Sequence, residues 1–245
     1  MSTIALVTGG NRGLGLATAT ALARSGATVI IAGRDAEAVH TAAADLVGQG
    51  LSAEALTMDV ASPTSVAAAA EAITERHGRL DILVNNAGIL PEANATREHQ
   101  FVDIDVLART FETNVFGVAA VTERFLPLLR RSDAGRIVNV SSTMGSLNDQ
   151  TNEHSQYYTS VLPAYQASKA AVNSMTIGLS KKLAGTRLKV TAVCPGWVQT
   201  DLAPGNREQA PTSAEEAAEV VVKAATLPEH APSGTFIDLA GPVPW

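Results

Sequence analysis

The chain has 245 residues, of which 46% are hydrophobic and 17% are charged, a balance that fits a compact folded protein and excludes a disordered one. Its net charge of −6, without a cluster of Lys and Arg, argues against nucleic acid as a partner. No apolar run reaches the ~18 residues that a membrane-spanning helix needs, so we expect no membrane insertion.

Cysteine and histidine usage adds further expectations. The single cysteine, Cys194, cannot form an internal disulfide and fits the reducing cytoplasm. The five histidines are scattered without ligand spacing, so we expect no metal site. The chain enters an apolar run at Ile4 without a charged leader or a cleavage site, which favours a cytoplasmic protein over a secreted one.

The first predicted element is a strand over residues 4–8, which runs into a glycine-rich turn and an Ala/Leu-rich helix to about residue 24. Strand, glycine turn and helix in this order are typical of dinucleotide binding, because the backbone can approach a pyrophosphate at a helix N-terminus. The spacing G-x-x-x-G-x-G differs from the commoner G-x-G-x-x-G, so a turn without a ligand remains the alternative. The candidate binding residues are Gly9, Asn11, Arg12, Gly13, Leu14 and Gly15.

The second predicted strand, over residues 28–32, bears on the choice of cofactor. Related folds place an acidic residue near its end to bond the adenosine ribose. Here Arg34 is the first side chain with reach, and Arg12 in the glycine turn adds a second guanidinium. Two planar cations suit a 2′-phosphate and favour NADP(H) over NAD(H), while Asp35 could cap the next helix or bind a ribose.

The alternation of strands and helices that follows predicts an α/β fold. We expect a doubly wound parallel sheet of the Rossmann type, formed by a single domain over residues 1–245. Ligands of such sheets bind beyond the carboxyl ends of the strands, where Gly9, Arg34, Asp59 and Asn86 are expected to lie. The elements of this half are a helix over 36–49, a strand over 51–58, a helix that begins at Ser62-Pro63 and runs to about 77, and a strand over 80–84.

In the second half, Asn114 falls within a predicted helical region, where an Asn is unfavourable. The sequence from Thr212 to Glu216 could form a capping box through Thr212 and Glu215 or through Ser213 and Glu216. The expected elements are a helix that begins over 107–113 and continues through 116–129, a strand over 136–140, a helix around Tyr165, a strand over 189–193, a helix to about 227 and a strand over 235–237.

Tyr165 and Lys169 lie four residues apart in a run of helix formers that Pro163 opens. Side chains at this spacing share one helical face, so both can point into the same cleft. A nearby cation favours the phenolate, so we expect Lys169 to lower the pKa of Tyr165 and make it a proton donor and acceptor. The spacing alone is weak evidence, because such pairs also occur on solvated helical faces.

Taken together, these motifs resemble the short-chain dehydrogenase/reductase family over nearly the whole chain. The matching pieces stand in the family's order: Thr8-Gly9-x-x-x-Gly13-x-Gly15, Asp59, Asn86-Ala87-Gly88, Asn114, Ser142, Tyr165-x-x-x-Lys169 and Pro195-Gly196.

For the reaction, the resemblance implies four catalytic residues. Tyr165 would protonate the carbonyl oxygen in reduction and act as base in reverse. Lys169 would hold the nicotinamide ribose, Ser142 would donate a hydrogen bond to the substrate oxygen, and Asn114 would hold a water that links Lys169 to solvent.

For the cofactor, the resemblance implies NADP(H), since Arg12 and Arg34 match the family's two basic positions. Asp59, with Val60 beside it, would bond the adenine amine, and Asn86, Ala87 and Gly88 would line the adenosine. Pro195, Gly196 and Val198 would contact the nicotinamide end together with Tyr165 and Lys169, and Thr200 would reach its carboxamide.

Two details need a choice. Ser141 and Ser142 are adjacent and point to opposite faces of a strand, and the family's serine lies three residues before a glycine, here Gly145, which selects Ser142. The interval from Ser142 to Tyr165 is longer than is usual in the family, which resembles the carbonyl-reductase-like branch. We expect this insertion to shape the substrate pocket. The family's usual dimer or tetramer is expected, and a monomer stays open.

The sequence therefore predicts an NADPH-dependent carbonyl reductase, or alcohol dehydrogenase in reverse, acting on a small-molecule ketone or aldehyde. Residues 200–212 are expected to form a lid, and Trp197 and Leu202 are candidates for the pocket. One alternative is a sensor that binds the dinucleotide without turnover. Another is an isomerase or dehydratase of the family's extended branch, which is disfavoured because only about 45 residues follow Asp201.

Overall fold

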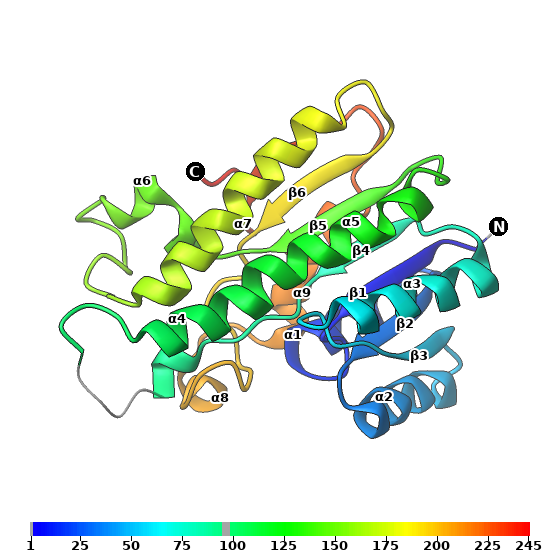
Figure 1. The fold of residues 1–245 in the computed structure, drawn as a ribbon, viewed down its shortest axis with the longest axis horizontal. Coiled ribbons are helices and arrows are strands. Elements are labelled where there is room, and N and C mark those ends of the chain that lie inside the picture. Colours follow the sequence, from blue (N-terminus) through cyan, green and yellow to red (C-terminus); the bar gives the residue numbers. More distant parts are fainter. Residues whose placement is uncertain (1, 95–98) are drawn as a thin grey trace.

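The computed structural model describes residues 2–94 and 99–245. Its centre is one sheet of seven strands, all parallel, in the order β3-β2-β1-β4-β5-β6-β7 (Figure 1). The predicted doubly wound parallel sheet is therefore confirmed. The strands are β1 Ile4–Thr8, β2 Thr28–Gly33, β3 Ala53–Thr57, β4 Ile82–Asn85, β5 Arg136–Val140, β6 Lys189–Val193 and β7 Thr235–Ile237.

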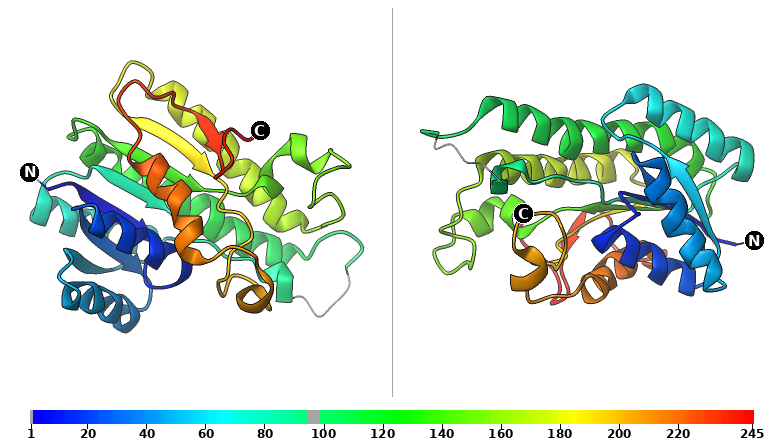
Figure 2. Two further views of the ribbon diagram at one scale, coloured as in Figure 1. Left: turned by 180° about the vertical axis from the view of Figure 1, so that it is seen from behind. Right: turned by 90° about the horizontal axis from the view of Figure 1, so that it is seen from below.

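Helices cover both faces of the sheet, and each layer has its own apolar core. Successive strand residues point to opposite faces, so Ala5 and Val7 of β1 pack against one layer while Leu6 packs against the other. Figure 2 shows α1 and α9 on the face that is hidden in Figure 1. The first layer consists of α1 Gly13–Arg24, α2 Ala36–Gly48 and α9 Ala214–Ala225, and the second of α3 Pro63–His77, α5 Val118–Leu129 and α7 Pro163–Lys182.

Shorter elements complete the described part of the chain. They connect the carboxyl ends of the strands with the second helix layer and with the loops at one end of the sheet. These elements are the helices α4 Ile104–Phe111, α6 Leu147–Gln150 and α8 Asn206–Gln209, the 3-10 helices η1 Pro91–Asn94 and η3 Thr143–Gly145, and the π-helical turn η2 Glu112–Gly117.

Polar caps decide the alternatives that the sequence left open. Asp35 accepts a hydrogen bond from the Ala38 N–H and so caps α2. Ser62 caps α3, with Pro63 in its first turn. The capping box of α9 is formed by Ser213 and Glu216.

Two strands are displaced from their predicted bounds. β3 is shorter than the predicted 51–58, because the Leu51 N–H bonds the carbonyl of Leu46 at the end of α2 rather than a strand. β4 begins at Ile82 rather than at residue 80, because the Leu80 N–H bonds the Leu128 carbonyl at the end of α5. In both cases a helix end competes with the sheet for the same backbone group.

The helical region around Asn114 begins earlier than predicted and is not broken. Asp103 accepts hydrogen bonds from the Asp105 and Val106 N–H groups and so starts α4 at Ile104 rather than at residue 107. The turn η2 then carries the chain into α5, so that α4 and α5 form one long rod in Figure 1. Asn114 lies in this π-helical turn, and such turns are frequent at functional sites.

Strand order reverses between β1 and β4, which are neighbours although β2 and β3 separate them in the chain. Ligands of such sheets bind at the carboxyl ends of the strands on either side of this reversal. Among the described residues, no helix is long and apolar enough to cross a membrane.

Candidate active site

The glycine turn after β1 has the backbone that a dinucleotide needs. Gly9 and Gly13 have φ angles of +60° and +51°, a left-handed conformation that favours glycine. A side chain at Gly15 would collide with the Gly9 carbonyl, so the first turn of α1 can lie against its own loop only because this residue is a glycine. No side chain caps the N-terminus of α1, in contrast to α2, α3 and α9. An anionic ligand is well suited to this uncapped helix end.

The motif after β4 braces this turn. The Asn86 side-chain amide donates hydrogen bonds to the carbonyls of Thr8 at 2.8 Å and Gly9 at 3.1 Å. The Thr8 hydroxyl in turn accepts from the backbone N–H groups of Asn86 and Ala87, each at 3.0 Å. Asn86 therefore holds the glycine turn, in addition to any contact with adenosine.

The predicted cofactor cations lie at the surface. The Arg12 side chain is 68% exposed and lies 3.6 Å from Asp201, which also pairs with Arg207. Arg34 is exposed at the end of β2. The Asn11 side chain lies over the end of the same strand, where a Cβ on Gly33 would be 3.0 Å from its Oδ1.

Asp59 and Val60 follow β3 at the same edge of the sheet. The Asp59 carboxylate accepts a hydrogen bond from the Ala61 N–H at 3.0 Å, and its own N–H donates to the Ser65 hydroxyl. Val60 packs against η2, where a Cβ on Gly117 would lie 3.0 Å from it. Both residues are partly buried, so their side chains remain accessible from solvent at this edge of the sheet.

Tyr165 and Lys169 project from the first turns of α7 and are almost fully buried, with 7% and 6% of their surface exposed. The ammonium of Lys169 lies 5.5 Å from the centre of the Tyr165 ring and donates a hydrogen bond to the Val140 carbonyl at 2.9 Å. Ser142 follows β5, and its hydroxyl lies close enough to the Tyr165 phenol to lower the pKa of that group. The structure thus brings the three residues together at the carboxyl end of β5.

The direction of the Tyr165 pKa differs from the prediction. Burial raises the pKa of Tyr165 well above its usual range, and Cys194 and Tyr157 add to this rise, while the hydrogen bond with Ser142 partly opposes it. Burial also lowers the pKa of Lys169 to about 8. The expected lowering by Lys169 is therefore wrong for the protein alone, because removing both groups from water outweighs the attraction between them.

Gly145 allows Ser142 to come so close to α7. A Cβ at this position would lie 2.6 Å from main-chain and side-chain atoms of Lys169. The two adjacent serines separate as predicted: the Ser141 hydroxyl is buried and donates to Asn173 at 2.6 Å, while Ser142 faces Tyr165.

Asn114 lies in η2, directly beneath the end of β4. Its side chain accepts a hydrogen bond from the Ile89 N–H at 2.8 Å and donates to the Ile89 carbonyl at 2.9 Å and the Ser168 hydroxyl at 3.2 Å. Both amide hydrogens are thus bonded to protein groups. A Cβ on Gly88 would lie within 3.7 Å of the Asn114 and Lys169 side chains, so the two residues meet at this glycine.

The segment after β6 closes against the glycine turn. A Cβ on Gly13 would lie 3.1 Å from the Thr200 methyl group, which places Thr200 over the turn. Val198 forms a bridge with Thr212, so residues 200–212 leave and re-enter the fold at one point. Pro195 is partly buried and Gly196, with φ of +83°, turns the chain toward Val198.

A cavity of about 300 Å³ lies beside this loop. Trp197 and Leu202, the two pocket candidates, are 42% and 36% exposed and do not line it; the Trp197 N–H donates to Asn206 in α8 instead. The cavity is lined by Asn94, Thr200, Asp201, Ala203, Pro204, Gly205, Arg207 and Glu208.

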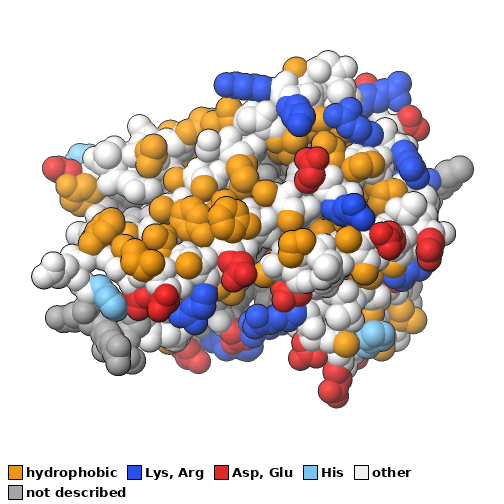
Figure 3. Space-filling view, in the orientation of Figure 1, with side chains coloured by type: hydrophobic (Ala, Val, Ile, Leu, Met, Phe, Trp, Pro, Cys, Tyr) orange, Lys and Arg blue, Asp and Glu red, His pale blue; other side chains and the backbone are white. Residues whose placement is uncertain are grey.

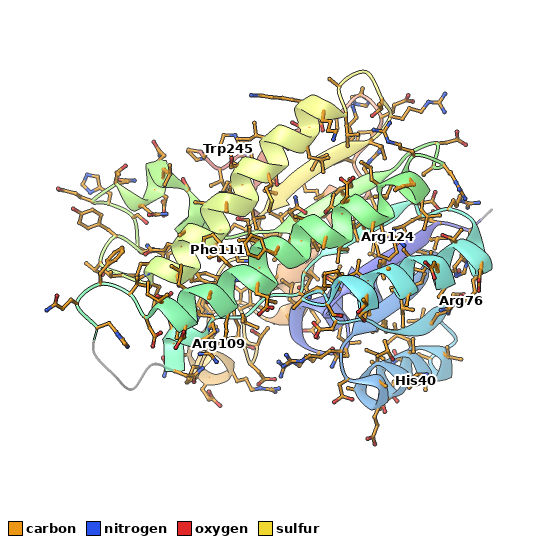
Figure 4. The ribbon with its side chains drawn as sticks, viewed as in Figure 1. His40, Arg76, Arg109, Phe111, Arg124 and Trp245 are labelled. Carbon is orange, nitrogen blue, oxygen red and sulfur yellow. The ribbon has the colours of Figure 1, made fainter. Side chains whose placement is uncertain are left out.

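The insertion between Ser142 and Tyr165 folds over the same end of the sheet. Burial raises the pKa of Tyr157, and this side chain is close enough to Cys194 and Tyr165 to interact with both. The N–H of Asn148 in α6 donates to the carbonyl of Trp245, which stacks on Phe236. Trp245 is labelled in Figure 4. The insertion is thus held at the site rather than free at the surface.

Sequence reasoning missed Glu92 in η1. Its carboxylate accepts hydrogen bonds from the backbone N–H groups of Ala164 and Tyr165. The sequence did indicate that a cap was missing. Leu162 precedes the helix and its side chain cannot accept a hydrogen bond, so the first N–H groups of α7 need an acceptor from another part of the chain. Nothing in the local pattern identified Glu92 as that acceptor.

Comparisons with known proteins agree with this geometry. Residues 3–211 match the family model described as short chain dehydrogenase. The chain is 38% identical to the short-chain dehydrogenase anuI of Penicillium roqueforti, with 95% of this chain and 91% of that protein covered. It is 32% identical to carbonyl reductase [NADPH] 1 of Mus musculus, with 99% and 98% covered.

A solved structure shows the same fold. The NADPH-bound carbonyl reductase from chicken fatty liver superimposes with a TM-score of 0.84 at 26% identity, over 100% of this chain and 99% of that one. The fold, the order of the motifs and the family match point the same way. The chain belongs to the short-chain dehydrogenase family.

Proposed function

We propose that the protein is an NADP(H)-dependent oxidoreductase of the carbonyl reductase type, which reduces a ketone or aldehyde to an alcohol or catalyses the reverse. The observation that carries the proposal is the meeting of Ser142, Tyr165 and Lys169 beside the glycine turn. A protein that only binds a dinucleotide has no need of a buried phenol next to a serine hydroxyl. The carbonyl reductases among the relatives support the substrate class.

The residues present fit NADP(H). The uncapped N-terminus of α1 and its glycine turn suit the pyrophosphate, and we assign the exposed guanidinium groups of Arg12 and Arg34 to the 2′-phosphate of the adenosine. Bound NADPH would supply the hydride. Asp59 would bind the adenine, and Lys169 the nicotinamide ribose.

In reduction, Tyr165 would give its proton to the carbonyl oxygen. The raised pKa of Tyr165 keeps the phenol protonated at neutral pH, which is the form that a proton donor needs. Ser142 would donate a hydrogen bond to the same oxygen and stabilise its developing negative charge. Lys169 is still mostly charged at pH 7, since its pKa is about 8, and would favour the phenolate that remains after proton transfer.

The substrate side favours a mostly apolar carbonyl compound. Tyr157 and Cys194 border Tyr165, and residues 200–212 would close over the bound molecules as a lid. Tyr157 and Cys194 carry no charge at neutral pH, and in the loop Asp201 and Arg207 pair with each other. Small and medium ketones and aldehydes are therefore the class to test first.

For self-association we keep the sequence prediction of a dimer or tetramer. Figure 3 shows hydrophobic side chains gathered on the face that carries α4, α5 and α7, where Ile104 and Phe116 are 68% and 65% exposed. Exposed apolar surface of this kind favours association. Sedimentation of the purified protein would test it, and a monomer at micromolar concentration would contradict it.

The proposed reaction is tested by steady-state oxidation of NADPH and NADH in the presence of a panel of ketones, aldehydes and quinones. Turnover with NADPH is the expected result. Tight NADPH binding without turnover across the panel would favour the sensor that the sequence left as an alternative. Preferred use of NADH would contradict the roles given to Arg12 and Arg34.

A further inference from the structure

The N-terminus of α7 is capped by a carboxylate from a distant part of the chain. Oε1 of Glu92 accepts a hydrogen bond from the Ala164 N–H at 3.0 Å, and Oε2 accepts one from the Tyr165 N–H at 2.8 Å. Pro163 has no N–H, and no side chain of the preceding residue caps the helix. One carboxylate therefore satisfies two open donors, the second of which belongs to Tyr165 itself.

The segment that carries Glu92 also holds the other parts of the site. Asn86 braces the glycine turn through the carbonyls of Thr8 and Gly9. Three residues later, both main-chain groups of Ile89 bond the Asn114 side chain. The stretch 86–92 thus contacts the cofactor turn, the π-helical turn and the helix of Tyr165 in succession.

We propose that Glu92 is a positioning residue for the reduction. By fixing the first turn of α7 to the segment after β4, its carboxylate sets the place of the Tyr165 hydroxyl relative to a cofactor in the glycine turn. This inference rests on the proposed function, because it assigns Glu92 to the same reaction.

A carboxylate suits this task for two reasons. Hydrogen bonds to an ionised acceptor are stronger than neutral ones, and a negative charge is favourable at the positive end of a helix. An uncapped first turn frays, and a displacement of ~1 Å at a catalytic group can cost about 10²-fold in rate. The loss of Glu92 should therefore reach the reaction through Tyr165.

Asp103 provides a matched control. Its carboxylate also accepts hydrogen bonds from two backbone N–H groups at a helix start, those of Asp105 and Val106 in α4. This cap is local, since the donors lie two and three residues away, whereas Glu92 reaches donors 72 and 73 residues away. Asp103→Ala opens as many donors as Glu92→Ala does, but on a helix without the phenol.

The test compares Glu92→Ala with Asp103→Ala in carbonyl reduction. We expect Glu92→Ala to lower kcat by about tenfold or more with KM for NADPH within about twofold, and Asp103→Ala to leave kcat within about twofold. Sodium acetate or formate, added as a replacement carboxylate, should restore part of kcat in Glu92→Ala and none in Asp103→Ala. A purely structural cap would lower the melting temperature of both variants without this difference.

Equal kcat values in the two variants, or no rescue by acetate and formate, would overturn the inference. If Glu92→Ala fails to fold, Glu92→Gln takes its place, since it keeps the shape and one of the two acceptor oxygens, and a loss of kcat beyond that of Asp103→Asn is expected.

A titration of the phenol separates this inference from the proposed function. If the native protein turns over no carbonyl compound, the proposed function fails, and ultraviolet titration of Tyr165, identified by its absence in Tyr165→Phe, decides about Glu92. We expect the phenol to titrate at lower pH in Glu92→Ala than in the native protein, because the opened helix end admits water. An unchanged titration would overturn the positioning role.

Discussion

The cofactor side and the catalytic side of the site are held in place by different means. On the cofactor side, the bonds join two neighbouring loops, and the glycine turn is held through Thr8 and Asn86. On the catalytic side, Tyr165 depends on contacts that reach across the chain, from Glu92 to α7 and from Ser142 after β5. Both sides depend on tertiary contacts, since Asn86 lies 78 residues from Thr8 and Glu92 lies 73 residues from Tyr165. They differ in what is held: the backbone of a turn on the first side, and the helix that carries the reacting phenol on the second.

The two sides also differ in burial. Arg12 and Arg34 are exposed, so their electrostatic interactions, including the ion pair of Arg12 with Asp201, are screened by salt. Tyr165 and Lys169 are buried, and burial favours the neutral form of each: it raises the pKa of Tyr165 and lowers the pKa of Lys169. We therefore expect substitutions on the cofactor side to change cofactor selectivity, and substitutions on the catalytic side to change kcat.

Removal of the phenol should have the largest effect. Tyr165→Phe removes the proton donor and leaves the glycine turn intact, so we expect kcat to fall by about 10³-fold with the Kd for NADPH changed by less than about tenfold. Steady-state kinetics and NADPH fluorescence measure the two quantities. A variant that keeps more than a tenth of the native kcat would contradict the role of Tyr165.

The adjacent serines form a matched pair within the catalytic side. Ser142→Ala should lower kcat by about 10²-fold, because it removes one donor to the developing oxyanion, and it should cost some stability, because the Met144 N–H loses its acceptor. Ser141→Ala should instead lower the free energy of unfolding by about 1–2 kcal/mol, since buried Asn173 loses its donor, and leave kcat within about threefold. Urea unfolding and kinetics on both variants check this, and the reverse assignment would show that Ser141 faces the substrate.

Variants on the cofactor side should change selectivity rather than rate. Removing both guanidinium groups in Arg12→Ala/Arg34→Ala should lower the ratio of kcat/KM for NADPH to that for NADH by about 10- to 100-fold, with the NADH value unchanged. Arg24→Ala at the end of α1 serves as the control and should change neither value. An unchanged ratio in the double variant would place the 2′-phosphate elsewhere.

The pH dependence should report the burial of Lys169. Its pKa of about 8 means that Lys169 loses its charge as the pH rises through 8, so kcat/KM for NADPH should fall by up to about tenfold between pH 8 and 9. Stability changes in the opposite direction. Between pH 8 and pH 10.5, Lys169 is protonated to a greater extent in the unfolded chain than in the folded one. The contribution of Lys169 to the free energy of unfolding therefore rises with pH over this range. A pH profile that stays flat to pH 10 would contradict the shift.

The sequence predicted those features of both sides whose geometry is local. The glycine turn, the cap by Ser62 and the shared face of Tyr165 and Lys169 follow from backbone preferences and helical spacing. Even the unfavourable position of Asn114 had a structural answer, the π-helical turn that aims its side chain at Ile89.

What the sequence could not predict depends on tertiary contacts. The acceptor for the N-terminus of α7 lies on Glu92, 73 residues before Tyr165, and no periodicity marks such a pair. The predicted lowering of the Tyr165 pKa was wrong, because helical spacing shows that Lys169 is near but does not show that both groups are buried. Burial is a property of the folded chain as a whole.

Hydride transfer from this site to a carbonyl carbon can be tested with NADPH that carries deuterium at both positions on C4 of the nicotinamide. The native protein is mixed with this cofactor and an accepted ketone, and the alcohol product is analysed by mass spectrometry. The account predicts one deuterium on the carbinol carbon of the product, and none formed by Tyr165→Phe. Cofactor that binds tightly but leaves every carbonyl compound unlabelled and unreduced would contradict it.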